Sequence, residues 1–67
     1  MKNIHNMSIG KEIKQERKRQ LLTQKQLSEM CNFSQMELSE YENEKRNPSL
    51  ERLNTLSRVL NKEWKLQ

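Results

Sequence analysis

Four carboxylates crowd one short stretch of a basic chain. The segment CNFSQMELSEYENEK, residues 31–45, contains Glu37, Glu40, Glu42 and Glu44, whereas the whole chain has a formal net charge of +4. Such a group either meets a partner or serves the architecture of the protein. The helix expected to carry the segment decides between these roles, because it fixes the direction of each side chain.

The helix predicted for residues 35–43 has a core face and an outward face. At about 100° per residue, Leu38 and Tyr41 fall together and define the core face. The outward face consists of Met36, Ser39, Glu40 and Asn43, with Gln35 at its edge. This outward face is the one that can meet a partner.

Only Glu40 among the four carboxylates points outward from the helix centre. Glu37 is expected to serve the helix cap, and Glu44 lies beyond the helix end. Glu42 lies on the flank of the core, where a half-buried carboxylate needs a cation. Arg17, on the flank of the first expected helix, is the best-placed candidate for a bidentate pair. We therefore predict a structural clasp between Arg17 and Glu42.

The other residues that could support chemistry are isolated. Cys31 is the only cysteine, which excludes an internal disulfide. We interpret it as a small buried hydrophobe, with an intermolecular disulfide as the alternative. His5 has no second ligand nearby and belongs to a polar tail. The sequence has no nucleophile–base pair, ligand cluster or glycine-rich phosphate loop. We therefore predict no enzyme, no cofactor, no metal and no small-molecule ligand.

Length and composition restrict the class of protein further. A chain of 67 residues forms one domain with a small core, and one glycine and one proline favour helix. No apolar run exceeds two residues, which argues against a membrane span or signal peptide and favours the cytoplasm. Residues 1–25 carry seven basic and two acidic side chains, hence +5. This basic section suggests a polyanionic partner, most commonly nucleic acid.

Caps and apolar spacing predict a single helical domain over residues 8–67 after a polar tail at 1–7. The expected helices cover residues 8–20, 24–31, 35–43, 50–60 and a short 62–66. Thr23 with Gln26, and Ser34 with Glu37, have the spacing of capping boxes. Two short helices joined by the three-residue turn 32–34 are typical of a helix-turn-helix.

Residues 9–61 resemble the Cro-like, phage-repressor type of helix-turn-helix, also called the xenobiotic-response-element family. The resemblance is strongest in the segments LTQ, LSEYEN and KRNPS. It implies an all-α fold, a compact lambda-repressor-like bundle of four to five helices with a central helix-turn-helix. It also implies a clasp at the places of Arg17 and Glu42.

The same resemblance implies a DNA interface. The expected base-reading residues are Gln35, Met36, Ser39 and Glu40. The residues expected at the DNA backbone are Gln24, Ser34, Asn43, Lys45 and Arg46. This assignment agrees with the outward face found from the helical wheel.

The predicted function is sequence-specific binding of double-stranded DNA by a small transcriptional repressor that reads the major groove with residues 35–43. A weak homodimer on a palindromic operator is expected, with Val59, Trp64 and Leu66 at the dimer interface. Trp64 has an alternative place in the core. The alternative function is an antitoxin, a restriction-modification controller, or a protein-interaction domain with little DNA binding.

The sequence departs from the family where glycine is common. The four positions are Leu21, Asn32, Glu44 and Asn61. Asparagine is a usual substitute, but leucine and glutamate each cost about 1–2 kcal/mol in a left-handed conformation. We therefore expect altered or strained junctions at Leu21 and Glu44. Glu16 replaces a frequent apolar residue and makes the predicted core smaller.

Overall fold

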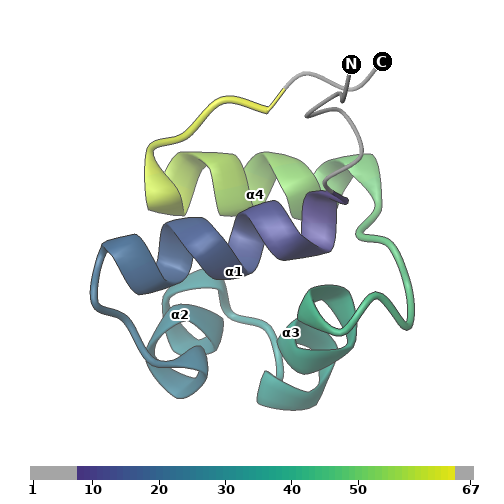
Figure 1. Ribbon diagram of the computed structural model, residues 1–67, viewed down its shortest axis with the longest axis horizontal. Helices are drawn as coiled ribbons and strands as arrows, with labels where there is room; N and C mark the ends of the chain where they lie inside the picture. The colour runs from purple at the N-terminus through teal and green to yellow at the C-terminus, as the bar shows by residue number, and fades with distance from the viewer. Residues whose placement is uncertain (1–7, 65–67) are drawn as a thin grey trace, which may run out of the picture.

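The computed structural model describes residues 8–64 and has four helices. They are α1 (Ile9–Arg19), α2 (Gln24–Cys31), α3 (Gln35–Glu42) and α4 (Leu50–Leu60). Helices α1 and α2 each pack against both α3 and α4, and α1 lies alongside α4 (Figure 1). The predicted all-α bundle is confirmed. No helix within residues 8–64 is long and apolar enough to cross a membrane.

The end of the described chain differs from the prediction. Residues 62–64 are not helical, so the described part of the helix expected at 62–66 is absent. The remainder of that segment, and the polar tail with His5, lie outside the described residues. A helix of only the five predicted residues would form too few backbone hydrogen bonds to offset the cost of nucleation.

Each helix begins at a hydroxyl cap, which explains where the four helices start. The hydroxyl oxygens of Ser8, Thr23, Ser34 and Ser49 each accept a hydrogen bond from the backbone N–H three residues later. The reciprocal half of the capping box is present at Thr23, where Gln26 accepts from the backbone N–H at 2.8 Å. The reciprocal contact expected from Glu37 is not made, because its carboxylate binds other residues. The predicted capping box is therefore wrong at Ser34, and only the simple cap remains.

The helix ends keep the left-handed backbone that glycine usually provides. Positive φ angles occur at Leu21 (60°), Asn32 (63°), Glu44 (62°) and Asn61 (57°). Asparagine tolerates this region, whereas leucine and glutamate meet the Cβ clash that disfavours it. The junctions after α1 and α3 are therefore strained rather than rebuilt.

The core is small and lies between all four helices. Its fully buried side chains are Ile13, Leu27, Leu38, Leu56 and Leu60. Phe33 and Tyr41 add an edge-to-face aromatic pair with ring centroids 6.2 Å apart. Cys31 is buried as predicted, and burial raises the pKa of its thiol to about 11.

Polar contacts surround the buried Glu16, where this residue makes the apolar core smaller. Arg19 Nε donates to the Glu16 carboxylate at 3.1 Å, and Gln20 Nε2 donates to it at 2.8 Å. The same Gln20 amide donates to the carbonyl oxygen of Leu60 at 2.7 Å and so joins α1 to the end of α4. Hydrogen bonds from Arg19, then Gln20, lower the pKa of Glu16 to about 2.

Candidate nucleic-acid interface

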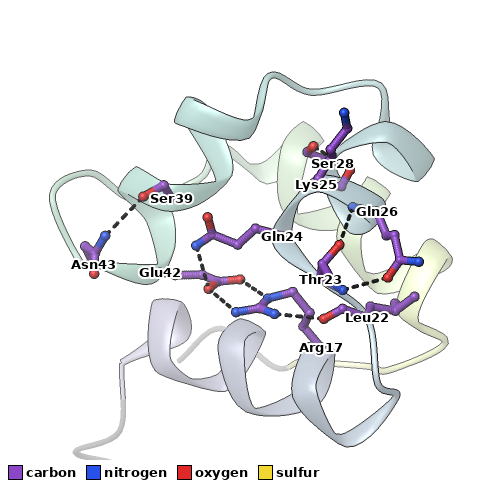
Figure 2. Close-up of polar contacts among 10 residues, drawn as sticks. All are labelled: Arg17, Leu22, Thr23, Gln24, Lys25, Gln26, Ser28, Ser39, Glu42 and Asn43. Carbon is purple, nitrogen blue, oxygen red and sulfur yellow. Dashed lines mark hydrogen bonds and ion pairs between the residues drawn. The ribbon is translucent and has the colours of Figure 1, made fainter.

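A buried ion pair fixes α3 against α1. Arg17 Nε donates to Glu42 Oε2 at 2.7 Å, and Arg17 Nη2 donates to Oε1 at 2.9 Å (Figure 2). Both side chains are buried, and Arg17 Nη1 also donates to the carbonyl oxygen of Leu22 at 2.8 Å. Gln24 Nε2, at the start of α2, donates to Glu42 Oε1 at 3.1 Å. The pair predicted from the helical wheel thus joins α1, α2 and α3.

A close backbone contact beside this pair was not predicted from the sequence. A Cβ atom built on Gly10 would lie 2.0 Å from the carbonyl oxygen of Tyr41, which is too close for any side chain. Helix α1 therefore lies directly against the last turn of α3. The available signal was the only glycine of the chain, placed inside a helix where glycine is unfavourable.

The outward face of α3 is open at its N-terminal end. Gln35 is exposed, and Met36 exposes 71% of its surface. Ser39 is half-buried and accepts a hydrogen bond from Asn43 Nδ2 at 3.1 Å (Figure 2). The face offers an amide, a thioether and a hydroxyl–amide pair to a partner.

Glu40 lies on the outer side of α3, where its carboxylate is already paired. It is half-buried, and its Oε1 lies 3.2 Å from Arg46 Nε. Arg46 Nη2 also lies 3.9 Å from Glu37 Oε2, and the guanidinium carbon of Arg46 is 5.4 Å from the centroid of the Tyr41 ring. Two residues predicted for different tasks, base reading and phosphate binding, therefore bind each other.

Glu37 is the centre of a second group of contacts. Arg52 Nε, from α4, lies 2.9 Å from its Oε2, and the Tyr41 hydroxyl donates to the same carboxylate. The guanidinium carbon of Arg52 also lies 4.6 Å from the centroid of the Phe33 ring. Burial, and then the hydrogen bond to Glu37, raise the pKa of Tyr41. These contacts join α3 to α4 beside the outward face.

The remaining residues expected at the DNA backbone surround the ends of α2 and α3. Ser34 Oγ accepts from the Glu37 backbone N–H at 3.0 Å, as a cap. Lys45 is exposed, and its backbone N–H donates to the Glu40 carbonyl oxygen at 2.8 Å. Gln24 is half-buried and already donates to Glu42. The structure therefore leaves Lys45 more accessible than Gln24.

The residues expected at a dimer interface are divided. Val59 and Trp64 are half-buried and pack against the core, whereas Leu66 lies outside the described residues. The indole Nε1 of Trp64 is buried and finds no acceptor within residues 8–64. Trp64 thus packs in part against the core, which is the alternative position predicted for it.

Comparisons with known proteins agree with this geometry. The model of the helix-turn-helix family matches residues 13–66. A solved structure of the P22 c2 repressor protein in complex with a synthetic operator is similar, with a TM-score of 0.81 and 28% identity over 87% of this chain and 88% of that chain. No curated protein matches the sequence. With four-fifths of its length matched, the chain belongs to the helix-turn-helix family.

Proposed function

We propose that the chain is a sequence-specific regulator of transcription, most simply a repressor, that reads the major groove of double-stranded DNA with α3. The observation that carries the proposal is the contrast between the two sides of this helix. Its inner side is fixed by the buried Arg17–Glu42 pair, and its outer side exposes Gln35 and Met36. A rigid helix with open polar and apolar side chains suits readout of base edges.

The side chains on the outer side have complementary chemistry toward bases. The Gln35 amide can pair with the two hydrogen-bonding groups of adenine, and Met36 can pack on a thymine methyl. Ser39 offers a hydroxyl, and the Glu40 carboxylate accepts from the amino group of cytosine. Sequence readout therefore falls to these four residues.

Phosphate contacts fix the register of the helix in the groove. The residues proposed for them are Gln24, Ser34, Asn43, Lys45 and Arg46. Only Lys45 and Arg46 carry positive charge, so electrostatic attraction at this interface is modest. A weak monomer–DNA contact makes a second bound copy useful.

A homodimer on a palindromic operator would supply that second copy. One recognition helix covers only a few base pairs, and half-sites for such dimers lie about 34 Å apart. Val59 and Trp64, with Leu66, are the proposed contact between the two copies. Trp64→Ala should lower cooperativity on a two-half-site operator more than affinity for one half-site. One chain bound to a palindrome in sedimentation would rule the dimer out.

A protein-directed role is the second candidate, as in an antitoxin or a restriction-modification controller. The observation in its favour is the acid beside the outer side of α3, since Glu37 and Glu40 offset the charge of Arg46. Such a surface has less attraction for phosphate than a basic one.

Selection of duplexes from a random DNA library, followed by gel-shift titration, tests the proposal. We expect a recurrent sequence that is bound more tightly, by about tenfold or more, than a scrambled duplex of equal length. Equal affinity for both duplexes, with or without competitor DNA, would favour the protein-directed role.

A further inference from the structure

The residue pair Glu40–Arg46 carries an inference that rests on the proposed function and goes beyond it. Glu40 is proposed to read a base and Arg46 to bind phosphate, yet the two side chains occupy each other in the free protein. Arg46 Nε lies 3.2 Å from Glu40 Oε1, with roughly half of the arginine side chain exposed. Neither side chain can make all of its proposed contacts with DNA while the two remain paired.

Release of Arg46 would affect its two carboxylate partners unequally. Glu37 would keep Arg52 at 2.9 Å and the Tyr41 hydroxyl, so its charge would stay compensated. Glu40 has no other cation partner within residues 8–64. Of the two carboxylates, Glu40 alone is therefore left without a cation when Arg46 is released, and Arg46 in addition leaves the Tyr41 ring.

The loop that carries Arg46 is fixed close to α3, so opening needs only a side-chain movement. The backbone N–H of Glu44 donates to the Tyr41 carbonyl oxygen at 3.1 Å, and that of Lys45 donates to the Glu40 carbonyl oxygen at 2.8 Å. These bonds end α3 and hold the following residues against it. Arg46 can thus exchange Glu40 for a phosphate without unfolding the loop.

We infer that Glu40 and Arg46 act as one selectivity device, in which Glu40 masks Arg46 until the groove offers a hydrogen-bond donor. On an unrelated sequence, binding of Arg46 to phosphate leaves Glu40 uncompensated among phosphates. On a sequence that places a cytosine amino group at Glu40, both side chains gain a partner together. Glu40 therefore sets discrimination between sequences more than affinity for the correct one.

The first test compares Glu40→Gln with Glu51→Gln, a matched control. Glu51 is exposed in the first turn of α4 and has no ion pair within residues 8–64, so its substitution changes the net charge equally. Glu40→Gln should tighten binding to a scrambled duplex about three- to fivefold beyond the control, the size expected of an exposed ion pair. Binding to the selected duplex should not tighten, so the ratio of the two affinities falls. Equal effects of the two substitutions on the scrambled duplex would overturn the inference.

A double-mutant cycle separates masking from simple repulsion between Glu40 and phosphate. Repulsion predicts that Glu40→Gln tightens scrambled-duplex binding equally with and without Arg46. Masking predicts that Glu40→Gln tightens scrambled-duplex binding more when Arg46 is present. It also predicts that the salt dependence of binding becomes steeper, as expected for about one additional phosphate contact. Equal gains in the wild-type and Arg46→Gln backgrounds would overturn masking.

The Nε–H resonance of Arg46 reports the pair directly by nuclear magnetic resonance. It should shift in free Glu40→Gln, remain near its free position on a scrambled duplex, and shift on the selected duplex. An unchanged resonance in free Glu40→Gln would show that the pair does not form. If the wild-type chain selects no sequence, the proposed function fails, whereas the scrambled-duplex cycle and this resonance still decide whether Glu40 masks Arg46.

Discussion

Glu40 and Glu42 stand two residues apart on α3, and each pairs with an arginine from outside that helix. Glu42 meets Arg17 through two hydrogen bonds, and both side chains are buried. Glu40 meets Arg46 through one contact of 3.2 Å, and both side chains are partly open to solvent. The same chemistry thus occurs once inside the bundle and once at its surface.

The difference between these pairs comes from the rotation of the helix. Two residues turn an α-helix by about 200°, so Glu40 and Glu42 point to nearly opposite sides of α3. A buried charge whose partner is removed is strongly unfavourable, whereas an exposed ion pair contributes about 0–1 kcal/mol. The inner pair therefore determines stability, and the outer pair remains available for exchange with a ligand.

The largest expected effect comes from breaking the inner pair. Arg17→Ala should lower the free energy of unfolding by about 3–5 kcal/mol, because Glu42 stays buried without its cation. Arg46→Ala, the matched change in the outer pair, should lower it by about 1 kcal/mol or less. Denaturant unfolding of both variants measures the contrast. Similar midpoints for the two variants would mean that Glu42 is solvated and that the comparison fails.

The next effect concerns binding, where we expect the order to reverse. Gln35→Ala should weaken binding to the selected duplex by about 1–3 kcal/mol and relax the preference at one base pair. Lys45→Ala should weaken binding to selected and scrambled duplexes alike and flatten the salt dependence. Neither change should shift the unfolding midpoint appreciably, since both side chains are exposed. Equal losses for Gln35→Ala on both duplexes would refute its base-reading role.

Much of the inner architecture could be predicted, because it follows from helix periodicity and the cost of burying charge. Leu38 and Tyr41 fall on one face of the wheel, and Glu42 at its flank demands a cation. The outer contacts could not be predicted in the same way. Arg46 sits on a loop whose course depends on the backbone of Glu44, and Arg52 comes from another helix. The contact of Gly10 with α3 depends on an interhelix distance that periodicity does not contain.

A third glutamate–arginine pair, Glu16 with Arg19, is intermediate between the other two and makes the comparison sharper. The carboxylate is buried, whereas Arg19 is largely exposed. The pKa of Glu16 falls from 4.5 to about 2 in the folded chain, mainly through its hydrogen bond from Arg19. The stabilisation is therefore complete above about pH 4.5 and is lost as the pH falls towards 2.

Glu16→Gln should consequently destabilise the fold at pH 7 and do so less at pH 2. Glu12→Gln is the control on the same helix, because Glu12 has no ion pair within residues 8–64. Thermal unfolding across this pH range measures the difference between the two variants. A cost of Glu16→Gln that is independent of pH would show that packing, and not charge, holds Glu16.

The smallest expected effects come from the two left-handed residues, one of which lies beside each compared pair. Leu21 directly precedes Leu22, whose carbonyl oxygen accepts a hydrogen bond from Arg17. Glu44 precedes the loop residues that include Arg46. Relief of the left-handed penalty, about 1–2 kcal/mol, exceeds the flexibility that glycine adds to the unfolded chain, about 0.5–1 kcal/mol. Leu21→Gly and Glu44→Gly should therefore each stabilise the fold by about 0.5–1 kcal/mol.

Asn32→Gly is the control for these two substitutions, because asparagine already tolerates the left-handed region and should gain less. Leu21 exposes 88% of its surface, so its removal costs little packing, whereas Glu44 also loses an exposed ion pair with Lys11 at 3.8 Å. The gain in stability should thus be slightly larger at Leu21.

Glu44→Gly should in addition leave binding to the selected duplex unchanged if hydrogen bonds from the loop backbone, and not the side chain of Glu44, position Arg46. A loss of binding without a loss of stability would show that the strained loop itself presents Arg46 to DNA.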